Sequence, residues 1–303
     1  MRFRVTIPFV LLVLLASVQF ALADLSEWRR PLSIPFLKDA QYDPRITRVG
    51  KMLFFDPRLS GAQNISYSSC HNPSFGWGAP VDRVIGAANT PLGRSAPSTL
   101  NVAWAGPLFF WDGQTHGLEE QAGGPITADA EMTSSFDQTR LRLGQVPEYL
   151  QRFDTLFLGE SMTEGTINRV IATFERTIVA GWSPFGCRVD GDETALSASA
   201  QRGFDLFTGV AGCSNCHTGW NFTNGQFDDI GLPDDDPGRS VVTKDYNDDH
   251  KFKSPSLHNI ALRAPYIHNG SLPTLESVAN HYSAGVVNRP TTATNLMPFS
   301  VTG

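Results

Sequence analysis

Apolar side chains recur every three or four residues in several stretches of this 303-residue chain. The clearest stretches span residues 162–180 and 275–282, and the second begins shortly after Pro273. The apolar positions of the first are Ile167, Val170, Ile171, Phe174 and Ile178, and those of the second are Leu275, Val278, Ala279 and Tyr282. Because this spacing places them on one face of a helix, the sequence predicts amphipathic helices with a buried stripe.

Two long stretches lack such spacing. Residues 79–107 and 219–250 are rich in Gly, Pro, Asn and Asp, which predicts loops. Loops of that length are unusual in a compact domain unless something other than side chains fills the core, and a large apolar cofactor would fill it. We therefore expect an all-α fold with long irregular loops.

The first residues have the features of an export signal. Two arginines, at positions 2 and 4, precede an apolar run over residues 7–20, and small residues for cleavage follow at 21–23. We therefore expect residues 1–23 to be a signal peptide and the protein to be periplasmic. The apolar run is short for a membrane anchor, so no stable membrane insertion is expected after cleavage, and an uncleaved anchor is the alternative interpretation.

The charge balance argues against nucleic-acid binding. Removal of residues 1–23 leaves 22 Lys and Arg against 30 Asp and Glu, a net charge of about −8. A nucleic-acid-binding face would need a basic surface instead. An acidic surface fits ordinary solubility, and it would also attract a small basic electron carrier.

Two of the four cysteines form a complete haem-attachment motif. Residues 213–217 read C-x-x-C-H, in which two thiols bond the haem vinyl groups and the adjacent imidazole binds the iron. A zinc site or a redox dithiol would be the other interpretations, but neither a second ligand pair nor a βαβ pattern accompanies the motif. The motif therefore predicts a haem c bound through Cys213, Cys216 and His217.

A related but incomplete motif lies in the first half of the chain. Cys70 and His71 keep the end of the haem motif, but Tyr67 stands where its first cysteine would be. A phenol cannot form the thioether, so either a single thioether through Cys70 tethers a haem whose iron His71 binds, or the site has lost its haem. The sequence G-x-x-L-F precedes both Cys-His pairs, at 50–54 and 203–207, which indicates an internal duplication.

The spacing of the two Cys-His pairs predicts two domains. His71 and His217 lie 146 residues apart, which is about one domain length. We expect one domain over residues 24–190 and a second over residues 191–303, each built around one haem.

Several short stretches, together with the complete haem motif, follow one another in a distinctive order. They are Phe110-Trp111-Asp112-Gly113, Leu118-Glu119-Glu120-Gln121-Ala122, Gly124-Pro125-Ile126, Glu131-Met132, Phe174-Glu175-Arg176-Thr177 and Ala264-Pro265-Tyr266-Ile267-His268-Asn269-Gly270. In this order the chain resembles the bacterial di-haem cytochrome c peroxidase and MauG family over nearly its whole mature length. The resemblance implies two all-α cytochrome c-like domains, one haem c in each, and a calcium ion between them.

The resemblance also implies that the N-terminal haem reacts with peroxide and that His71 is its iron ligand. Glu131 and Gln121 match the distal pocket of the family. Cleaving the peroxide O–O bond requires a proton to move between its oxygens, so we expect Glu131 to act as acid and base and Gln121 to orient the substrate. Trp111 matches the tryptophan between the two haems, where it would relay electrons, although it also fits a core position. Residues 81–95 contain no histidine, so an open iron site is expected.

In the C-terminal domain the resemblance implies a second axial ligand, and this position holds Tyr282. MauG-like proteins have Tyr there, whereas peroxidases that accept electrons from carriers have Met. A phenolate favours higher oxidation states of iron, and a core role on the helix face is the alternative for Tyr282.

The calcium ligands implied by the resemblance are a side-chain oxygen of Ser95 and the backbone carbonyls of Arg263 and Pro265. The family commonly has Asn in place of the first residue and Thr in place of the second, so this set departs from the usual pattern. Cys187 has no role in the family, and we expect a buried structural thiol there. Relatives continue into a final helix, which the C-terminal domain is expected to lack.

These features predict a periplasmic di-haem oxidoreductase of the peroxidase type, which reduces hydrogen peroxide at the His71 haem and oxidises a redox partner protein. Tyr282 favours a MauG-like protein substrate over a small cytochrome or cupredoxin as that partner. The alternative is a passive periplasmic electron-transfer cytochrome c in which only the His217 haem functions.

Overall fold

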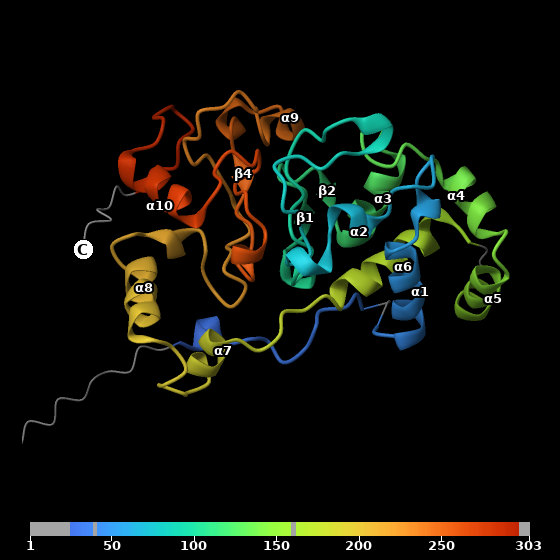
Figure 1. The fold of residues 1–303 in the computed structure, drawn as a ribbon, viewed down its shortest axis with the longest axis horizontal. Coiled ribbons are helices and arrows are strands. Elements are labelled where there is room, and N and C mark those ends of the chain that lie inside the picture. Colours follow the sequence, from blue (N-terminus) through green and yellow to red (C-terminus); the bar gives the residue numbers. More distant parts are fainter. Residues whose placement is uncertain (1–24, 39–40, 159–161, 297–303) are drawn as a thin grey trace, which may run out of the picture.

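The computed structural model describes residues 25–38, 41–158 and 162–296. The predicted signal peptide and the chain end after position 296 lie outside these residues. Figure 1 shows two lobes side by side, which we call the N lobe (blue to yellow-green) and the C lobe (yellow to red).

The N lobe is built from helices that pack around a single apolar core. Its helices are α1 (Pro44–Phe54), α2 (Tyr67–Cys70), α3 (Leu118–Thr127), α4 (Phe136–Leu143), α5 (Pro147–Leu156) and α6 (Glu164–Arg176). Helix α6 is the predicted helix of residues 162–180, and it begins at Thr163, whose hydroxyl accepts a hydrogen bond from Thr166 N. Its buried face includes Ile167, Val170 and Ile171, so the predicted apolar stripe is confirmed.

The C lobe contains shorter elements and longer loops. Its helices are α8 (Ala198–Thr208), α9 (Ser240–Thr243) and α10 (Leu275–Ala284), and α7 (Pro184–Val189) lies below it in Figure 1. Helix α10 is the second predicted helix, and it begins after Thr274, whose hydroxyl caps Ser277 N. The all-α prediction is confirmed, because the sheets of the described residues are two small antiparallel pairs. These are β1 (Leu108–Phe109) with β2 (Thr115–His116), and β3 (Phe227–Asp228) with β4 (Phe252–Lys253).

The long loops of both lobes contain short 3-10 turns. They are η1 (Ser26–Trp28), η2 (Pro57–Leu59), η3 (Pro73–Phe75), η4 (Ala87–Asn89), η5 (Val102–Trp104), η6 (Cys213–Asn215), η7 (Tyr246–Asp248) and η8 (Ile260–Leu262). The loop predicted over 79–107 is confirmed, with such turns inside it, whereas residues 219–250 are irregular over most of their length but also contain strand β3 and helix α9.

The start of the described chain lies against the C lobe. Trp28 is buried, and its ring packs on those of Phe204 and Phe222 at centroid distances of 5.2 and 5.1 Å. Phe185 of α7 joins the same aromatic group. A domain boundary after residue 190 stays a prediction, since segments before it contribute to the packing of the C lobe.

Helices α8 and α10 contain no buried residue, although both carry apolar side chains such as Phe207 and Val278. The buried stripe predicted for residues 275–282 is therefore wrong, because little of the described chain packs over that face of α10. The core of buried hydrophobic side chains gathers in the N lobe instead. The apolar residues of the C lobe therefore surround a region that side chains of the described chain do not close, as expected around a large apolar group.

Candidate functional site

Helix α2 presents the incomplete haem motif on one short turn. Ser66 and Ser69 form a capping box at its start, which places Cys70 at its end and His71 just beyond. Tyr67 is buried, its ring stacks on Phe54 at 5.6 Å, and its hydroxyl donates to the Ala122 carbonyl of α3. The phenol that replaces the expected thiol is therefore a packing residue that fixes α2 against the core.

His71 has the environment of a metal-binding imidazole. Its Nδ1 lies 3.0 Å from the Pro97 carbonyl oxygen, and because a carbonyl only accepts, Nδ1 must carry the proton. The Nε2 lone pair is then free for a metal, an arrangement typical of histidine ligands. Burial lowers the pKa of His71 to about 4, so the ring is neutral at physiological pH, as ligation requires.

His217 repeats this arrangement in the C lobe. Its Nδ1 lies 3.0 Å from the Phe222 carbonyl oxygen, which again leaves Nε2 available. Burial lowers the pKa of His217 below its ordinary value. Two imidazoles far apart in the sequence thus share one hydrogen-bonding pattern.

The thiols at both motifs are unpaired. Turn η6 holds Cys213 and Cys216 beside His217, and burial raises the pKa of both thiols, to about 11 for Cys216. Burial also raises the pKa of Cys70 to about 12. The prediction that Cys187 is buried is wrong, because this thiol is exposed at the short helix α7, where little packs over it.

Tyr282, and not its neighbour, faces the haem motif of the C lobe. His281 Nε2 lies 2.9 Å from the Ile230 carbonyl oxygen, so the preceding ring is already engaged. Burial raises the pKa of the Tyr282 phenol, and the charges of Cys216 and Cys213 raise it further, so these groups lie close together. Tyr282 therefore lies close enough to the motif that it could bind the iron of a haem held by His217.

A carboxylate that the sequence analysis did not single out lies in the same place. Asp228 Oδ2 is 3.4 Å from Cys216 Sγ and 3.5 Å from Ser254 Oγ. Its charge also acts on His217 and Tyr282. The sequence pattern does not identify Asp228, because only the tertiary structure brings strand β3 next to the haem motif.

Glu131 faces the incomplete motif from the turn that follows α3. Burial raises the pKa of its carboxyl, and its charge acts on Tyr67 and Cys70. Gln121 lies on α3 directly before Ala122, the residue that accepts the Tyr67 hydrogen bond. The structure thus brings both predicted residues to the α2 side of the core, although the described side chains of Gln121 and Glu131 form no hydrogen bond with each other.

The loop of residues 81–95 closes over this turn. Ala87 N donates to the Glu131 carbonyl at 2.9 Å. A side chain at Gly86 would clash with the Ala130 carbonyl, so glycine is required for this close approach.

Trp111 lies where the two lobes meet. Its indole Nε1 donates to the Ser95 carbonyl at 2.8 Å, and its ring forms a T-shaped pair with that of His268, with centroids 6.3 Å apart. His268 is buried and stacks on Phe252 of the C lobe, with ring centroids 3.6 Å apart. Trp111 is therefore held between residues of both lobes.

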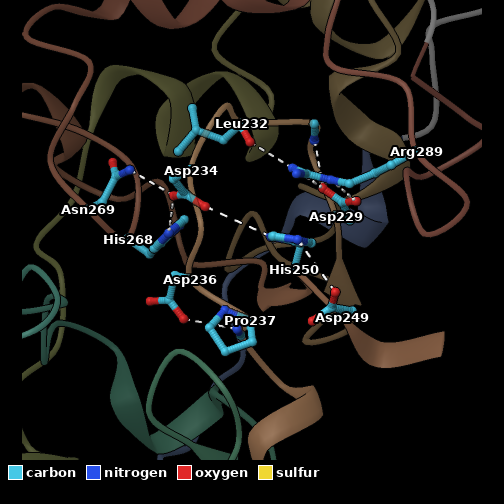
Figure 2. Close-up of polar contacts among 12 residues, drawn as sticks. Asp229, Leu232, Asp234, Asp236, Pro237, Asp249, His250, His268, Asn269 and Arg289 are labelled. Carbon is cyan, nitrogen blue, oxygen red and sulfur yellow. Dashed lines mark hydrogen bonds and ion pairs between the residues drawn. The ribbon is translucent and has the colours of Figure 1, made fainter. Parts of the chain in front are cut away.

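A network of acidic side chains anchors His268 from the other side (Figure 2). Asp234 Oδ2 lies 2.7 Å from His268 Nε2 and accepts a hydrogen bond from Asn269 Nδ2 at 2.8 Å. Arg289 pairs with the buried Asp229 at 2.9 Å in the same region. The acidic side chains of Asp229 and Asp234 thus bind other residues of the C lobe and are not merely solvated surface groups.

Comparisons with known proteins agree with this geometry. A sequence profile of the di-haem cytochrome c peroxidases matches residues 44–194. The chain is 42% identical to the methylamine utilization protein MauG of Methylorubrum extorquens over 294 residues, which cover 94% of this chain and 82% of that protein. It is 34% identical to cytochrome c551 peroxidase of Pseudomonas aeruginosa over 253 residues, or 80% of this chain and 72% of that one.

The chain belongs to the di-haem cytochrome c peroxidase family. A solved structure of a MauG-like protein associated with microbial copper homeostasis superposes with a TM-score of 0.81 at 28% identity and covers 89% of both chains. The recognition, the cytochrome c-like fold and the assignment as an oxidoreductase of the peroxidase type are confirmed.

Membership of this peroxidase family implies two haem c cofactors, hydrogen peroxide as a substrate and a redox partner. The residues fit both haems, because each lobe offers a neutral imidazole with a free Nε2 and at least one thiol nearby. Within the described parts of this peroxidase, no helix is both long and apolar enough to cross a membrane.

One predicted calcium ligand, Ser95, lies beside the segment that contains the other two. Ser95 joins the segment after Pro265, since its N donates to the His268 carbonyl at 2.7 Å and its hydroxyl donates to the Ile267 carbonyl at 2.9 Å. Calcium usually takes six to eight oxygens, several of them carboxylates. The described residues contain no cluster of three or more His, Cys, Asp or Glu that could hold a metal ion, so calcium would depend on carbonyl oxygens and water.

Proposed function

We propose that the protein is a periplasmic peroxidase that reduces hydrogen peroxide at the haem of His71 and draws electrons from a protein donor through the haem of His217. The observation that carries the proposal is the matched pair of imidazoles, each oriented by a backbone carbonyl at 3.0 Å. The periplasmic location is supported by the signal-like residues 1–23 alone.

The chain's own residues supply proton transfer at the N-lobe site. When bound, the haem supplies the iron at which peroxide is reduced. Reduction of one peroxide to two waters consumes two electrons and two protons, so a group must move protons to the departing oxygen. Burial favours the protonated form of Glu131, which allows its carboxyl to give a proton and take one back. Gln121 has an amide that can hold the peroxide by hydrogen bonds.

A single thioether through Cys70 would tether the N-lobe haem. Tyr67 cannot form the second thioether bond to the haem. Its hydroxyl bonds to the Ala122 carbonyl instead, and His71 keeps its own hydrogen bond to the Pro97 carbonyl, so the iron ligand stays in position. The iron bond and the surrounding apolar contacts then hold the cofactor.

The donor is proposed to be an aromatic side chain of a partner protein. Tyr282 as a phenolate ligand would favour higher oxidation states at the C-lobe haem, and one of the relatives is MauG. A small cytochrome or a cupredoxin is the other donor that such an acidic protein would accept.

Haem stoichiometry tests the proposal directly. Purified, haem-replete protein should contain two haems per chain by iron analysis and pyridine haemochrome absorbance, and intact mass should show two covalently attached haems, as expected for attachment at Cys70 and at the Cys213/Cys216 pair. The mass also reports signal removal, and parallel metal analysis reports calcium. One haem per chain would refute the proposed peroxidase.

The missing thiol at Tyr67 favours a second candidate, a passive electron-transfer cytochrome with the His217 haem alone. Such a protein would contain one haem, show only a low-spin spectrum and fail to consume peroxide. Two haems with a high-spin component would exclude it.

The Glu131→Gln substitution tests the proton role. We expect the rate of peroxide reaction to fall about 10²- to 10⁴-fold, because the amide cannot exchange a proton, while haem content stays at two. Stopped-flow absorbance would measure this rate. The matched control is Glu164→Gln, an exposed acid at the start of α6, which should leave the rate unchanged. An unchanged rate in Glu131→Gln would remove the assigned role.

A further inference from the structure

A cavity of about 110 Å³ lies between the two lobes. Its walls include Pro97 of the N lobe, whose carbonyl holds His71, and residues 221 and 223 of the C lobe, which flank the carbonyl that holds His217. The cavity is therefore adjacent to the backbone that orients both proposed iron ligands. It has room for several water-sized groups.

One wall of the cavity contains the guanidinium of Arg263, which has no carboxylate partner in the described chain. Arg263 is 7% exposed, and its Nη2 makes only a long hydrogen bond, 3.4 Å to the Ser256 carbonyl. Its Nε is buried without a hydrogen-bond partner, and no carboxylate of the described chain forms an ion pair with it. Burial lowers the pKa of Arg263 to about 10. A buried guanidinium without an anion is costly, so a ligand from outside the polypeptide is expected beside it.

The fold makes specific room for this arginine. A Cβ added at Gly78 would lie 3.3 Å from Arg263 Cδ, which is tighter than most side-chain contacts. The absence of a side chain at Gly78 thus leaves space for the side chain of Arg263.

A second cation lines the same cavity. Lys253 Nζ donates to the Ala105 carbonyl at 2.5 Å and to the Leu108 carbonyl, which leaves one of its three N–H donors. Burial lowers the pKa of Lys253 to about 8. No Asp or Glu is among the described residues that line the cavity. Two cations without an acid repel a metal ion and attract an anion.

We propose that the cavity is a carboxylate-binding site, in which Arg263 and Lys253 hold either a propionate of a bound haem or a small carboxylate from solution. The guanidinium fork suits the two oxygens of a carboxylate, and the ammonium neutralises the remaining charge. The propionate source rests on the proposed function, because it requires a haem next to the cavity, whereas the solution source does not.

A crystal structure of the haem-loaded protein is the first test. Carboxylate density within hydrogen-bond distance of Arg263 would support the proposal, and its continuity with a haem would identify the source. A cavity that holds only water or a cation would overturn it.

Formate titration of the same protein is the second test. A saturable spectral change would identify a solution carboxylate, and no change would be expected where a propionate already fills the site. Arg263→Leu should abolish that response, or, in the propionate case, shift the midpoint potential of at least one haem downward. Arg202→Leu removes an exposed arginine of α8 and is the matched control.

Arg263→Lys keeps the charge without the planar fork and serves if the leucine variant fails to fold. We expect about tenfold weaker formate binding in the solution case, or a potential close to the wild-type value in the propionate case. If Arg263→Leu and Arg202→Leu give equal potentials and equal formate responses, the proposed site does not exist. Should the protein contain one haem per chain, the proposed function fails, but calorimetry with formate still decides on the cavity.

Discussion

At the scale of single residues, burial sets the protonation of several groups that the fold places in the N lobe. Glu175 is 2% exposed, one of its carboxyl oxygens lacks a partner in the described structure, and burial raises its pKa to about 8. Its neighbour Arg176 instead pairs with Glu119 at 2.6 Å. Of these two adjacent residues, Glu175 therefore favours its neutral, protonated form, whereas Arg176 is charged and paired with a carboxylate.

The raised pKa of Glu175 predicts a stability that falls as pH rises. Below about pH 4.5 the folded and unfolded chains both hold this proton; between about 4.5 and about 8 only the folded chain does, so stability drops by up to about 1.4 kcal/mol per pH unit. Glu175→Gln should therefore gain stability over the wild type near pH 8 and little near pH 5. Denaturant unfolding at both pH values would measure this. The exposed control Glu164→Gln should change the free energy of unfolding equally at both pH values. The same pH-independent behaviour in Glu175→Gln would contradict the prediction.

Asp228 predicts a shift in haem potential. Its carboxylate lies 3.4 Å from Cys216 Sγ, and a negative charge at this place stabilises oxidised iron. Asp228→Asn should raise the midpoint potential of the C-lobe haem, on the order of tens of millivolts, in spectroelectrochemical titration. Glu276→Gln removes an exposed charge from α10 and should leave the potential in place. Equal potentials in both variants would rule out the effect.

At the scale of elements, the two copies of the G-x-x-L-F sequence lie on helices with different surroundings. Gly50 is buried on α1 where this helix crosses α6, and an added Cβ would clash with the Val170 carbonyl. Gly203 lies on α8, where nothing comes within 4 Å of an added Cβ. The same glycine is therefore required for close helix packing in the N lobe and dispensable for it in the C lobe.

The paired glycines supply a matched test of helix packing. Gly50→Ala should destabilise the protein by about 1–3 kcal/mol, because the methyl group forces α1 away from α6. Gly203→Ala should instead be neutral or stabilise by about 0.5–1 kcal/mol, since alanine is the better helix former. Thermal unfolding followed by circular dichroism compares the two. A similar change in both variants would mean that the α1–α6 contact is not tight.

At the scale of the whole molecule, a charged latch joins the lobes near Trp111. Arg94 of the N lobe donates two hydrogen bonds to Asp236 of the C lobe, at 2.8 and 2.9 Å, and one to Asp112 at 2.7 Å. Burial alone would raise the pKa of Asp236, but the bonds from Arg94 outweigh it and lower that pKa. The latch thus depends on the carboxylate of Asp236 staying ionised, and it joins the two lobes beside Trp111.

Arg94→Met should loosen the contact between the lobes. Loss of the guanidinium leaves two partly buried carboxylates unpaired, which typically costs about 3–5 kcal/mol. We expect a lower unfolding midpoint and faster hydrogen exchange at the lobe junction, measured by mass spectrometry. Arg140→Met breaks an exposed ion pair with Asp137 on α4 and should cost less than about 1 kcal/mol. An effect of Arg94→Met no larger than this control would exclude the latch.

Much of this protein could be predicted from local patterns. The helices of residues 164–176 and 275–284 follow from apolar spacing, and the motif at Cys213 to His217 follows from chemistry that requires its three ligands on one turn. Such features depend on residues close together in the chain, so the sequence by itself determined them. It also determined the family, through the order of several short motifs.

Only the tertiary structure decided how distant residues meet. It packed Tyr67 against α3, exposed Cys187, placed Asp228 beside a thiol, and enclosed Arg263 with Lys253 in one cavity. These outcomes arise from burial and from contacts between segments far apart in sequence, whose free energies depend on the complete packing of both lobes. No periodicity or spacing encodes them locally, because each requires two surfaces that exist only after the chain has folded.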